Sequence, residues 1–401
     1  MAGGYLDRRT APHITTLVMA TATGALALNV FLPSLPAMAR YFQADYAIVQ
    51  LTVSLYLAAT AVLQLLIGPA SDRFGRRPVM LISFAIFILA TIAAIFAPTI
   101  EILLACRVFQ AFAVAGMVLS RAIVRDTVSA DLAASRIGYI TMGMTLVPML
   151  GPIVGGFLDE AYGWQATFAL TLAFGIISFA FVYSDLGETN RNLSSSFGAQ
   201  FRAYPELLRS RRFWGYALTA AFTSGSFFAF LGGAPYIATE LLGVTPSAYG
   251  LYFAIAGLGY MGGNFISGRF AARVGINRMM LAGNVVTAFG VLMSLTIFLV
   301  GFIHPLALFG PMIFTGAGNG ITLPSANAGV VSVKPHLAGS ASGLGGAMQI
   351  GGGAALSVVA GVLLTPESGA YPLLFVMLLS ALGGIAAALY VIRVARQAGE
   401  L

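Results

Sequence analysis

Long uncharged apolar runs alternate with short polar segments along the whole chain. A helix needs about 20 apolar residues to cross a bilayer core roughly 30 Å thick. We therefore predict twelve membrane-spanning helices, at 13–37, 48–70, 79–97, 100–122, 136–158, 164–184, 212–238, 248–270, 279–301, 304–330, 338–363 and 370–392. The longest polar stretch separates the first six spans from the last six. The pattern predicts an all-α membrane protein with two six-helix bundles, at 1–184 and 212–401, joined by a cytoplasmic linker at 185–211.

Composition supports this fold class and excludes several others. Hydrophobic residues make up 58% of the chain and charged residues 9%, whereas soluble domains are about 45–50% apolar. The single cysteine excludes an intramolecular disulfide and a cysteine-based metal cluster, and we expect no metal site. The first apolar run follows Arg8 and Arg9 but is too long for a signal peptide, so we expect an uncleaved first helix.

The basic residues predict the orientation of the chain in the membrane. With the N-terminus inside, nearly all of them fall in cytoplasmic segments, whereas Arg40 falls outside and Arg107 lies within a span. This is the positive-inside pattern, so both termini are expected in the cytoplasm. The net charge of +7 is spread over many short loops, and this excludes a surface that binds nucleic acid.

The two halves of the chain are similar in sequence. At an offset of 200 positions, five residues recur: Gly68, Arg73, Gly75, Met80 and Leu81 match Gly268, Arg273, Gly275, Met280 and Leu281. Gln64 corresponds to Asn264 at the same offset, so both are candidate polar groups within spans 2 and 8. Two parallel six-span repeats are typical of a transporter whose substrate site lies between the halves near the membrane midplane.

The segment "GPASDRFGRRP" at 68–78, predicted as the loop between spans 2 and 3, concentrates charge in an otherwise apolar region. It resembles the loop signature of the major facilitator superfamily, G-x-x-x-D-R-x-G-R-R, which is filled here by Gly68, Asp72, Arg73, Gly75, Arg76 and Arg77. The resemblance implies a cytoplasmic latch in which Asp72 approaches the start of span 11 and Arg76 or Arg73 pairs with Asp126. The alternative is that these charges only enforce topology.

Two further motifs narrow the resemblance. "RVFQAFAVAG", from Arg107, resembles the span-4 motif R-x-x-Q-G with Ala111 in place of glycine, and "GPIVGG" resembles the span-5 motif of proton-driven exporters through Gly151, Pro152, Gly155 and Gly156. Close helix packing through small residues is the alternative for the second motif. With "FLPSLPAMARYF" and "GWQATF", the chain resembles the Bcr/CflA group of drug:proton antiporters.

This second resemblance implies a monomeric carrier of the bacterial inner membrane. It would export small amphipathic drugs or metabolites by alternating access. The proton gradient would supply the energy, without a cofactor.

Asn29 stands where the resemblance implies an acidic residue, and no carboxylate falls in the middle of a span. In one interpretation, Asn29 and Gln110 hold Arg107 structurally, and proton coupling uses Glu101, Asp126 or a proton of the substrate. In another, Arg107 is an unneutralised positive centre that recruits an anionic or strongly hydrogen-bonding substrate. A third is that Asn29 is an engineered or natural replacement that locks one state.

The resemblance also implies which spans line the substrate pathway. Candidate lining residues, beside Asn29, Gln64, Arg107 and Gln110, are Tyr56, Phe222, Phe227, Phe228, Phe230, Asn319, Asn327 and Gln349. Apolar walls with a few polar groups are typical of sites for amphipathic molecules. Each aromatic residue taken alone also fits a role in packing.

Other classes of function fit the sequence less well. An ATP-driven pump needs Gly-Lys-Ser/Thr, and Lys334, the only lysine, lies in "VKP". An intramembrane enzyme needs paired acids, a Ser–His pair or a metal cluster at depth, and the three histidines fall near helix ends. An uncoupled facilitator or a transporter-like sensor stays an alternative because Asn29 cannot exchange a proton.

Overall fold

The computed structural model describes residues 7–128, 130–190, 199–334, 337–365 and 367–397, and the elements within these ranges are helical. The first half contains α1 (Ile14–Asn29), η1 (Leu32–Ser34), α2 (Leu35–Phe42), α3 (Tyr46–Phe74), α4 (Arg76–Ile95), α5 (Ile100–Gln110), η2 (Ala111–Ala113), α6 (Val114–Thr127), α7 (Ala130–Tyr162) and α8 (Trp164–Asp185). The second half contains α9 (Ala199–Leu208), α10 (Arg211–Tyr236), η3 (Ile237–Leu241), α11 (Pro246–Val274), α12 (Ile276–Leu299), α13 (Pro305–Phe309), α14 (Met312–Ser332), α15 (Ala338–Leu363) and α16 (Tyr371–Gln397).

Each predicted span is a long helix or a helix with a local break. Within the described ranges, ten helical segments are long and apolar enough to cross a membrane, and α7 and α11, with 33 and 29 residues, also have the necessary length. Span 1 breaks at η1, because Pro33 and Pro36 lack the backbone N–H groups that a continuous helix needs. The predicted all-α membrane fold is confirmed.

The segment 68–78 is helical, which corrects its prediction as a loop. α3 continues through Phe74 and α4 begins at Arg76, so Gly75 alone joins them. Gly75 has φ +97°, in the left-handed region that favours glycine. Gly275, with φ +88°, makes the corresponding turn between α11 and α12. The internal repeat in the sequence is therefore a repeated one-residue turn in the structure.

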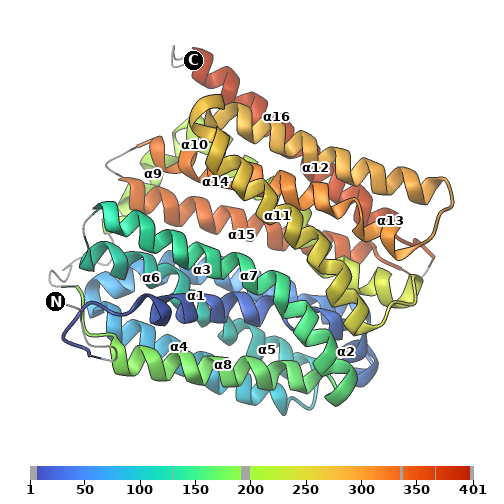
Figure 1. Ribbon diagram of the computed structural model, residues 1–401, viewed down its shortest axis with the longest axis horizontal. Helices are drawn as coiled ribbons and strands as arrows, with labels where there is room; N and C mark the ends of the chain where they lie inside the picture. Colours follow the sequence, from blue (N-terminus) through green and yellow to red (C-terminus); the bar gives the residue numbers. More distant parts are fainter. Residues whose placement is uncertain (1–6, 129, 191–198, 335–336, 366, 398–401) are drawn as a thin grey trace.

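The helices form two groups that lie side by side (Figure 1), α1 to α8 in one and α10 to α16 in the other. The groups meet mainly where α3 packs against α15 and α7 packs against α11. The predicted domain boundaries at 184/185 and 211/212 stay predictions, and residues 191–198 of the linker lie outside the described ranges. Because two helix pairs form most of the boundary, the space between these pairs is where a site shared by both halves can lie.

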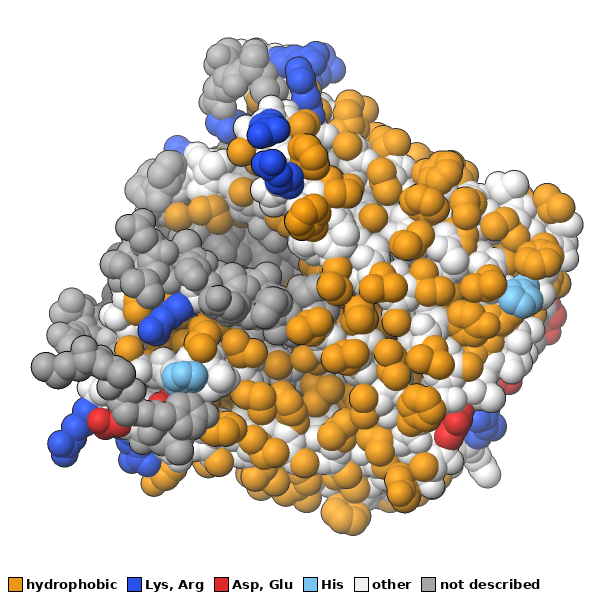
Figure 2. Space-filling model, in the orientation of Figure 1, with side chains coloured by type: hydrophobic (Ala, Val, Ile, Leu, Met, Phe, Trp, Pro, Cys, Tyr) orange, Lys and Arg blue, Asp and Glu red, His pale blue; other side chains and the backbone are white. Residues whose placement is uncertain are grey.

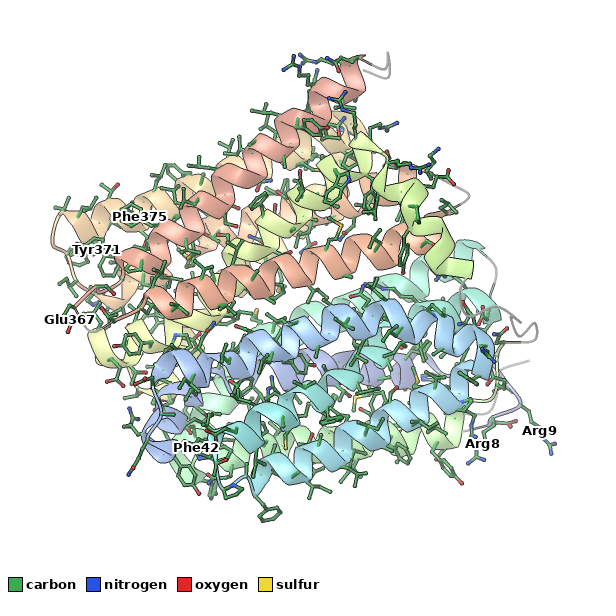
Figure 3. The ribbon with its side chains drawn as sticks, turned by 180° about the vertical axis from the view of Figure 1, so that it is seen from behind. Arg8, Arg9, Phe42, Glu367, Tyr371 and Phe375 are labelled. Atoms are coloured by element: carbon green, nitrogen blue, oxygen red, sulfur yellow. The ribbon has the colours of Figure 1, made fainter. Side chains whose placement is uncertain are left out.

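The surface has the polarity that a membrane requires. Figure 2 shows apolar side chains over the middle of the visible face and charged side chains toward its two ends. Phe265 and Leu379, for example, are 74% and 67% exposed. In Figure 3, Arg8 and Arg9 lie at one end of the molecule and Glu367 at the opposite end. The charge pattern identifies the end that carries Arg8 as cytoplasmic.

Candidate functional site

A cavity of about 260 Å³ lies between the two halves. Its lining comes from α1, α3, η2, α6 and α7 on one side and from α10, α11, α14 and α15 on the other. Both helix pairs that join the halves contribute, so a relative movement of the halves changes the shape of this space. A carrier that alternates between two faces of a membrane needs a site with this placement.

Six of the residues predicted from the sequence line this cavity. They come from five helices and are Asn29, Tyr56, Phe227, Phe228, Asn319 and Gln349. The lining therefore combines aromatic faces with amide and hydroxyl groups, as small-molecule sites commonly do.

Arg107 and Gln110 do not line the cavity, which corrects their prediction as substrate-binding residues. Arg107 is fully buried. Its Nε donates to the carbonyl oxygen of Thr52 at 2.9 Å, and its Nη1 donates to Oε1 of Gln110 at 2.6 Å. The guanidinium carbon lies 4.4 Å from the ring centroids of Phe31 and Tyr56. Of these side chains, only Tyr56 also reaches the cavity.

These contacts favour the structural interpretation of Arg107. Gln110 holds the guanidinium and is itself fixed by a hydrogen bond to Thr91 (2.9 Å). Asn29 does not take part, because its Nδ2 donates to the carbonyl oxygen of Ala25 at 2.8 Å. A carbonyl, an amide and two ring faces surround the cation in place of a carboxylate, and its Nη2 is buried without a hydrogen-bond partner. In this structure Arg107 is fully buried and lies outside the cavity lining.

Gln64 and Phe230 also lie outside the lining, which corrects two further predictions. Phe230 is 1% exposed and packs between the rings of Phe253 and Phe309, with centroid distances of 5.9 and 5.8 Å. Gln64 of α3 lies against Gly346 of α15, where the two halves meet. Phe230 therefore packs the second half, and Gln64 belongs to the boundary between the halves.

The structure adds polar lining residues that the sequence did not single out. Thr21, Thr60, Ser224 and Tyr260 line the cavity. Hydroxyl residues are common within apolar helices, and nothing in the sequence distinguishes these four. Oδ1 of Asn29 and Oγ of Ser224 are buried and have no hydrogen-bond partner. A substrate that donates hydrogen bonds would satisfy both oxygens.

The predicted latch residues form a network at the cytoplasmic end of the first half. Arg76 binds Asp72 and also lies 3.0 Å from Oδ2 of Asp126. The backbone N–H groups of Arg76 and Arg77 donate to Glu188 at 2.9 and 3.2 Å. Among the described residues, the hydrogen bonds and ion pairs of Asp72 join it to Arg76 and to Asn190 of the linker. No hydrogen bond or ion pair joins Asp72 to the described residues of span 11.

The two other arginines of the signature have separate roles. Arg73, the alternative partner for Asp126, lies over the ring of Phe74 at 5.4 Å. Arg77 donates from Nε to the carbonyl oxygen of Leu186 at 2.8 Å, and this bond ties α4 to the end of α8. Arg76 is therefore the arginine that links α3, α4 and α6.

Polar contacts between the halves are made near the outer ends of the helices. They join Arg40 to Glu240 (3.0 Å), Tyr46 to the carbonyl of Gly232 (2.7 Å), Gln50 to the carbonyl of Ser357 (2.7 Å), and the backbone N–H of Ser247 to Glu160 (2.9 Å). The Gln50 contact is buried, whereas the Arg40 ion pair is exposed and is screened by salt. In this conformation the two halves are bonded to each other at the outer end.

The "GPIVGG" motif brings α7 into contact with two other backbones. Gly155 lies against the carbonyl of Val30 at the break in span 1, and Gly156 lies against the carbonyl of Pro246 at the start of α11. A Cβ atom at either position would collide with the carbonyl oxygen. Gly151 has more room, because a Cβ there would lie 3.6 Å from Cβ of Asn29. The motif therefore packs span 5 within its own half and against the other half.

Two repeated halves with a shared cavity are the arrangement expected of a carrier, and the sequence comparison decides the family. The pattern of the Major Facilitator Superfamily matches residues 17–355 and, in a second match, residues 222–400. The chain belongs to this superfamily. It is a transporter with multiple membrane spans and not an enzyme.

Individual members of the superfamily are similar over most of the chain. "Uncharacterized MFS-type transporter YdgK" of Bacillus subtilis (strain 168) is 32% identical over 92% of each chain. "Multidrug resistance protein D" of Escherichia coli (strain K12) is 29% identical over 88% of this chain and 89% of its own. The crystal structure of a D-xylose-proton symporter has the same fold, with a TM-score of 0.75, 15% identity and coverage of 94% and 96%. The family resemblance predicted from the motifs is confirmed.

Proposed function

We propose that this major facilitator protein exports small uncharged amphipathic molecules across the bacterial inner membrane by alternating access, as a monomer. The cavity lining carries the proposal, because among the described residues it contains no Asp, Glu, Lys, Arg or His. A charged substrate would lose its hydration there without gaining a counter-ion. The aromatic and amide groups suit a neutral molecule with hydrogen-bond donors. The name of the Escherichia coli relative supports a drug-like substrate.

The first prediction concerns the charge of the substrate. We expect the purified protein to bind an uncharged phenicol at least tenfold more tightly than a lipophilic cation or an organic anion of similar size. Phe227→Ala removes an aromatic wall of the cavity and should weaken phenicol binding about tenfold. Phe265→Ala is the matched control, because Phe265 is 74% exposed and outside the lining. Calorimetry measures both effects, and tighter binding of either ion would contradict the proposal.

Proton-driven antiport is the second candidate, and the resemblance of "GPIVGG" to proton-driven exporters favours it. This candidate requires a group that binds and releases a proton. Glu101 is exposed at the outer end, and Asp126 is paired with Arg76. Neither residue lines the cavity. A proton carried by the substrate is the coupling route that needs no carboxylate in the cavity.

The two candidates differ in the movement of protons with a substrate that cannot ionise. We expect the wild-type protein in liposomes to transport such a phenicol without a change of lumenal pH and without accumulation against its gradient. A pH-sensitive dye in the lumen measures the first quantity, and radiolabelled substrate measures the second. Proton movement that requires this substrate would reject uncoupled transport, and movement opposite to that of the substrate would establish antiport. Binding without transport would reject the export function itself.

A further inference from the structure

A basic groove lies at the cytoplasmic end of the second half, away from the substrate cavity. It has a volume of about 730 Å³ and is formed by the first turns of α12 and the last turns of α16. Three arginines line it, Arg278 from α12 and Arg393 and Arg396 from α16. Arg393 and Arg396 are three residues apart, so their side chains lie on one face of α16. Figure 2 shows basic side chains gathered at this corner of the molecule.

The described residues of the second half supply almost no negative charge near these arginines. Beyond residue 211, the acidic residues are Glu240, Glu367 and Glu400. Glu240 pairs with Arg40 at the outer end, Glu367 lies at that same end in Figure 3, and Glu400 is outside the described residues. Glu206, the nearest acid before this region, binds Lys334 at 3.2 Å. Within the described part of the chain, no ion pair neutralises the arginines of the groove.

The remaining walls of the groove are mostly apolar. Leu281, Leu389 and Ile392 lie beside the arginines, and Leu389 is 50% exposed. Leu389 precedes Arg393 by one helical turn, so the apolar part of the wall lies toward the membrane interior. Guanidinium groups bind phosphate oxygens through paired hydrogen bonds. The start of α12 adds the favourable field of a helix N-terminus.

We propose that this groove binds an anionic glycerophospholipid of the cytoplasmic leaflet. The phosphate contacts the three arginines, and one acyl chain lies along Leu281 and Leu389. Basic pockets between helices on this side of a membrane are suited to such headgroups. Since α12 and α16 belong to the same half, the lipid stays with that half while the halves move. A lipid headgroup and a soluble phosphate ester can both offer phosphate oxygens to the arginines. Only the lipid also has an acyl chain that can pack against the apolar wall.

Native mass spectrometry of the purified full-length protein tests this site. The probes are phosphatidylglycerol, phosphatidylcholine with the same acyl chains, and glycerol phosphate. The test variant is Arg393→Gln/Arg396→Gln. The control is Arg269→Gln/Arg273→Gln, which removes the same charge from exposed residues at the same end but outside the groove.

We expect phosphatidylglycerol to remain bound to the wild type and to the control, and its retention on the test variant to fall at least fivefold. Phosphatidylcholine should be retained at least fivefold less than phosphatidylglycerol on the wild type. Equal losses in the two double variants would overturn the proposal, because binding would then follow net charge. Competition by glycerol phosphate at equal concentration would also overturn it, because the acyl chain would contribute nothing. If the test variant does not fold, Arg278→Gln replaces it with the same expected loss.

Discussion

Gly156→Ala is expected to lower the transport rate at least tenfold, although the change adds a single methyl group. Gly156 of α7 lies directly against the carbonyl of Pro246, and Gly250 of α11 lies against Pro152 and Ile153. A Cβ on Gly250 would approach Cα of Ile153 to 2.6 Å. Because backbone atoms meet backbone atoms in both directions, no flexible side chain can move aside. The methyl group must separate α7 from α11 and so disfavour the conformation that is closed at the outer end.

The same helix supplies a matched control. Gly151→Ala introduces the same methyl group where a Cβ has an ordinary contact of 3.6 Å with Asn29, so transport should stay within twofold of the wild type. Transport of a phenicol by equal amounts of protein in liposomes measures both variants. Spin labels at positions 162 and 251, both exposed in the wild type, should be farther apart in Gly156→Ala. Similar rates for the two variants would show that the close α7–α11 contact is not needed for transport.

Gly250→Ala adds a methyl group to the same α7–α11 contact, on the α11 side. If Gly156→Ala fails to fold, the tenfold loss is expected in Gly250→Ala with the same separation of the spin labels. If these variants lose transport but their spin labels do not move apart, the defect lies within one half of the protein. Gly155, which contacts Val30, would then be the relevant glycine of the motif.

The sequence predicts the architecture well because crossing a bilayer is a local requirement. A run of about twenty apolar residues specifies a span whatever its neighbours are, and the positions of arginines specify the orientation. The break at η1 is also local, since Pro33 and Pro36 cause it. The prediction of a loop at 68–78 is wrong because Gly75 makes the whole turn by itself. A sequence pattern does not show how few residues a turn will use.

The candidate site is only partly predictable because it depends on helix rotation and on partners far along the chain. Asn29 and Asn319 reach the cavity, whereas Phe230, three residues after the lining residue Phe227, faces the core of its own half. The sequence leaves open a role for Arg107 in the cavity because an intramembrane charge is usually functional. Its partners Thr52 and Phe31 come from other spans, and no spacing within span 4 indicates them.

Asn29→Asp is expected to convert the carrier into one that moves protons with an uncharged substrate. Asn29 is 2% exposed, lines the cavity and donates from Nδ2 to the carbonyl of Ala25. A carboxylate cannot make that bond and would place its charge beside the carbonyl oxygen. A protonated carboxyl group can donate there instead, so the introduced side chain keeps its proton while the site is closed. When water enters the cavity, the carboxylate is hydrated and the proton is released.

Lumenal pH in liposomes measures this gain. With a phenicol that cannot ionise, proton movement in Asn29→Asp should exceed that of the wild type at least tenfold. The variant should also bind a lipophilic cation at least tenfold more tightly at pH 8 than the wild type does, because the introduced carboxylate supplies the missing counter-ion. Asn264→Asp is the matched control. Asn264 makes the same hydrogen bond, to the carbonyl of Tyr260 at 2.9 Å, but does not line the cavity.

Each outcome assigns a different role to Asn29. Proton movement in Asn29→Asp but not in Asn264→Asp would show that the absent carboxylate is what separates this carrier from a proton-driven exporter. Movement in both variants would attribute the effect to added negative charge rather than to the cavity. A variant that binds the cation but moves no protons would contradict the expected exchange, because the carboxyl group would then stay ionised in both conformations. The measurement therefore tests whether one amide in α1 keeps this cavity uncharged and its transport independent of protons.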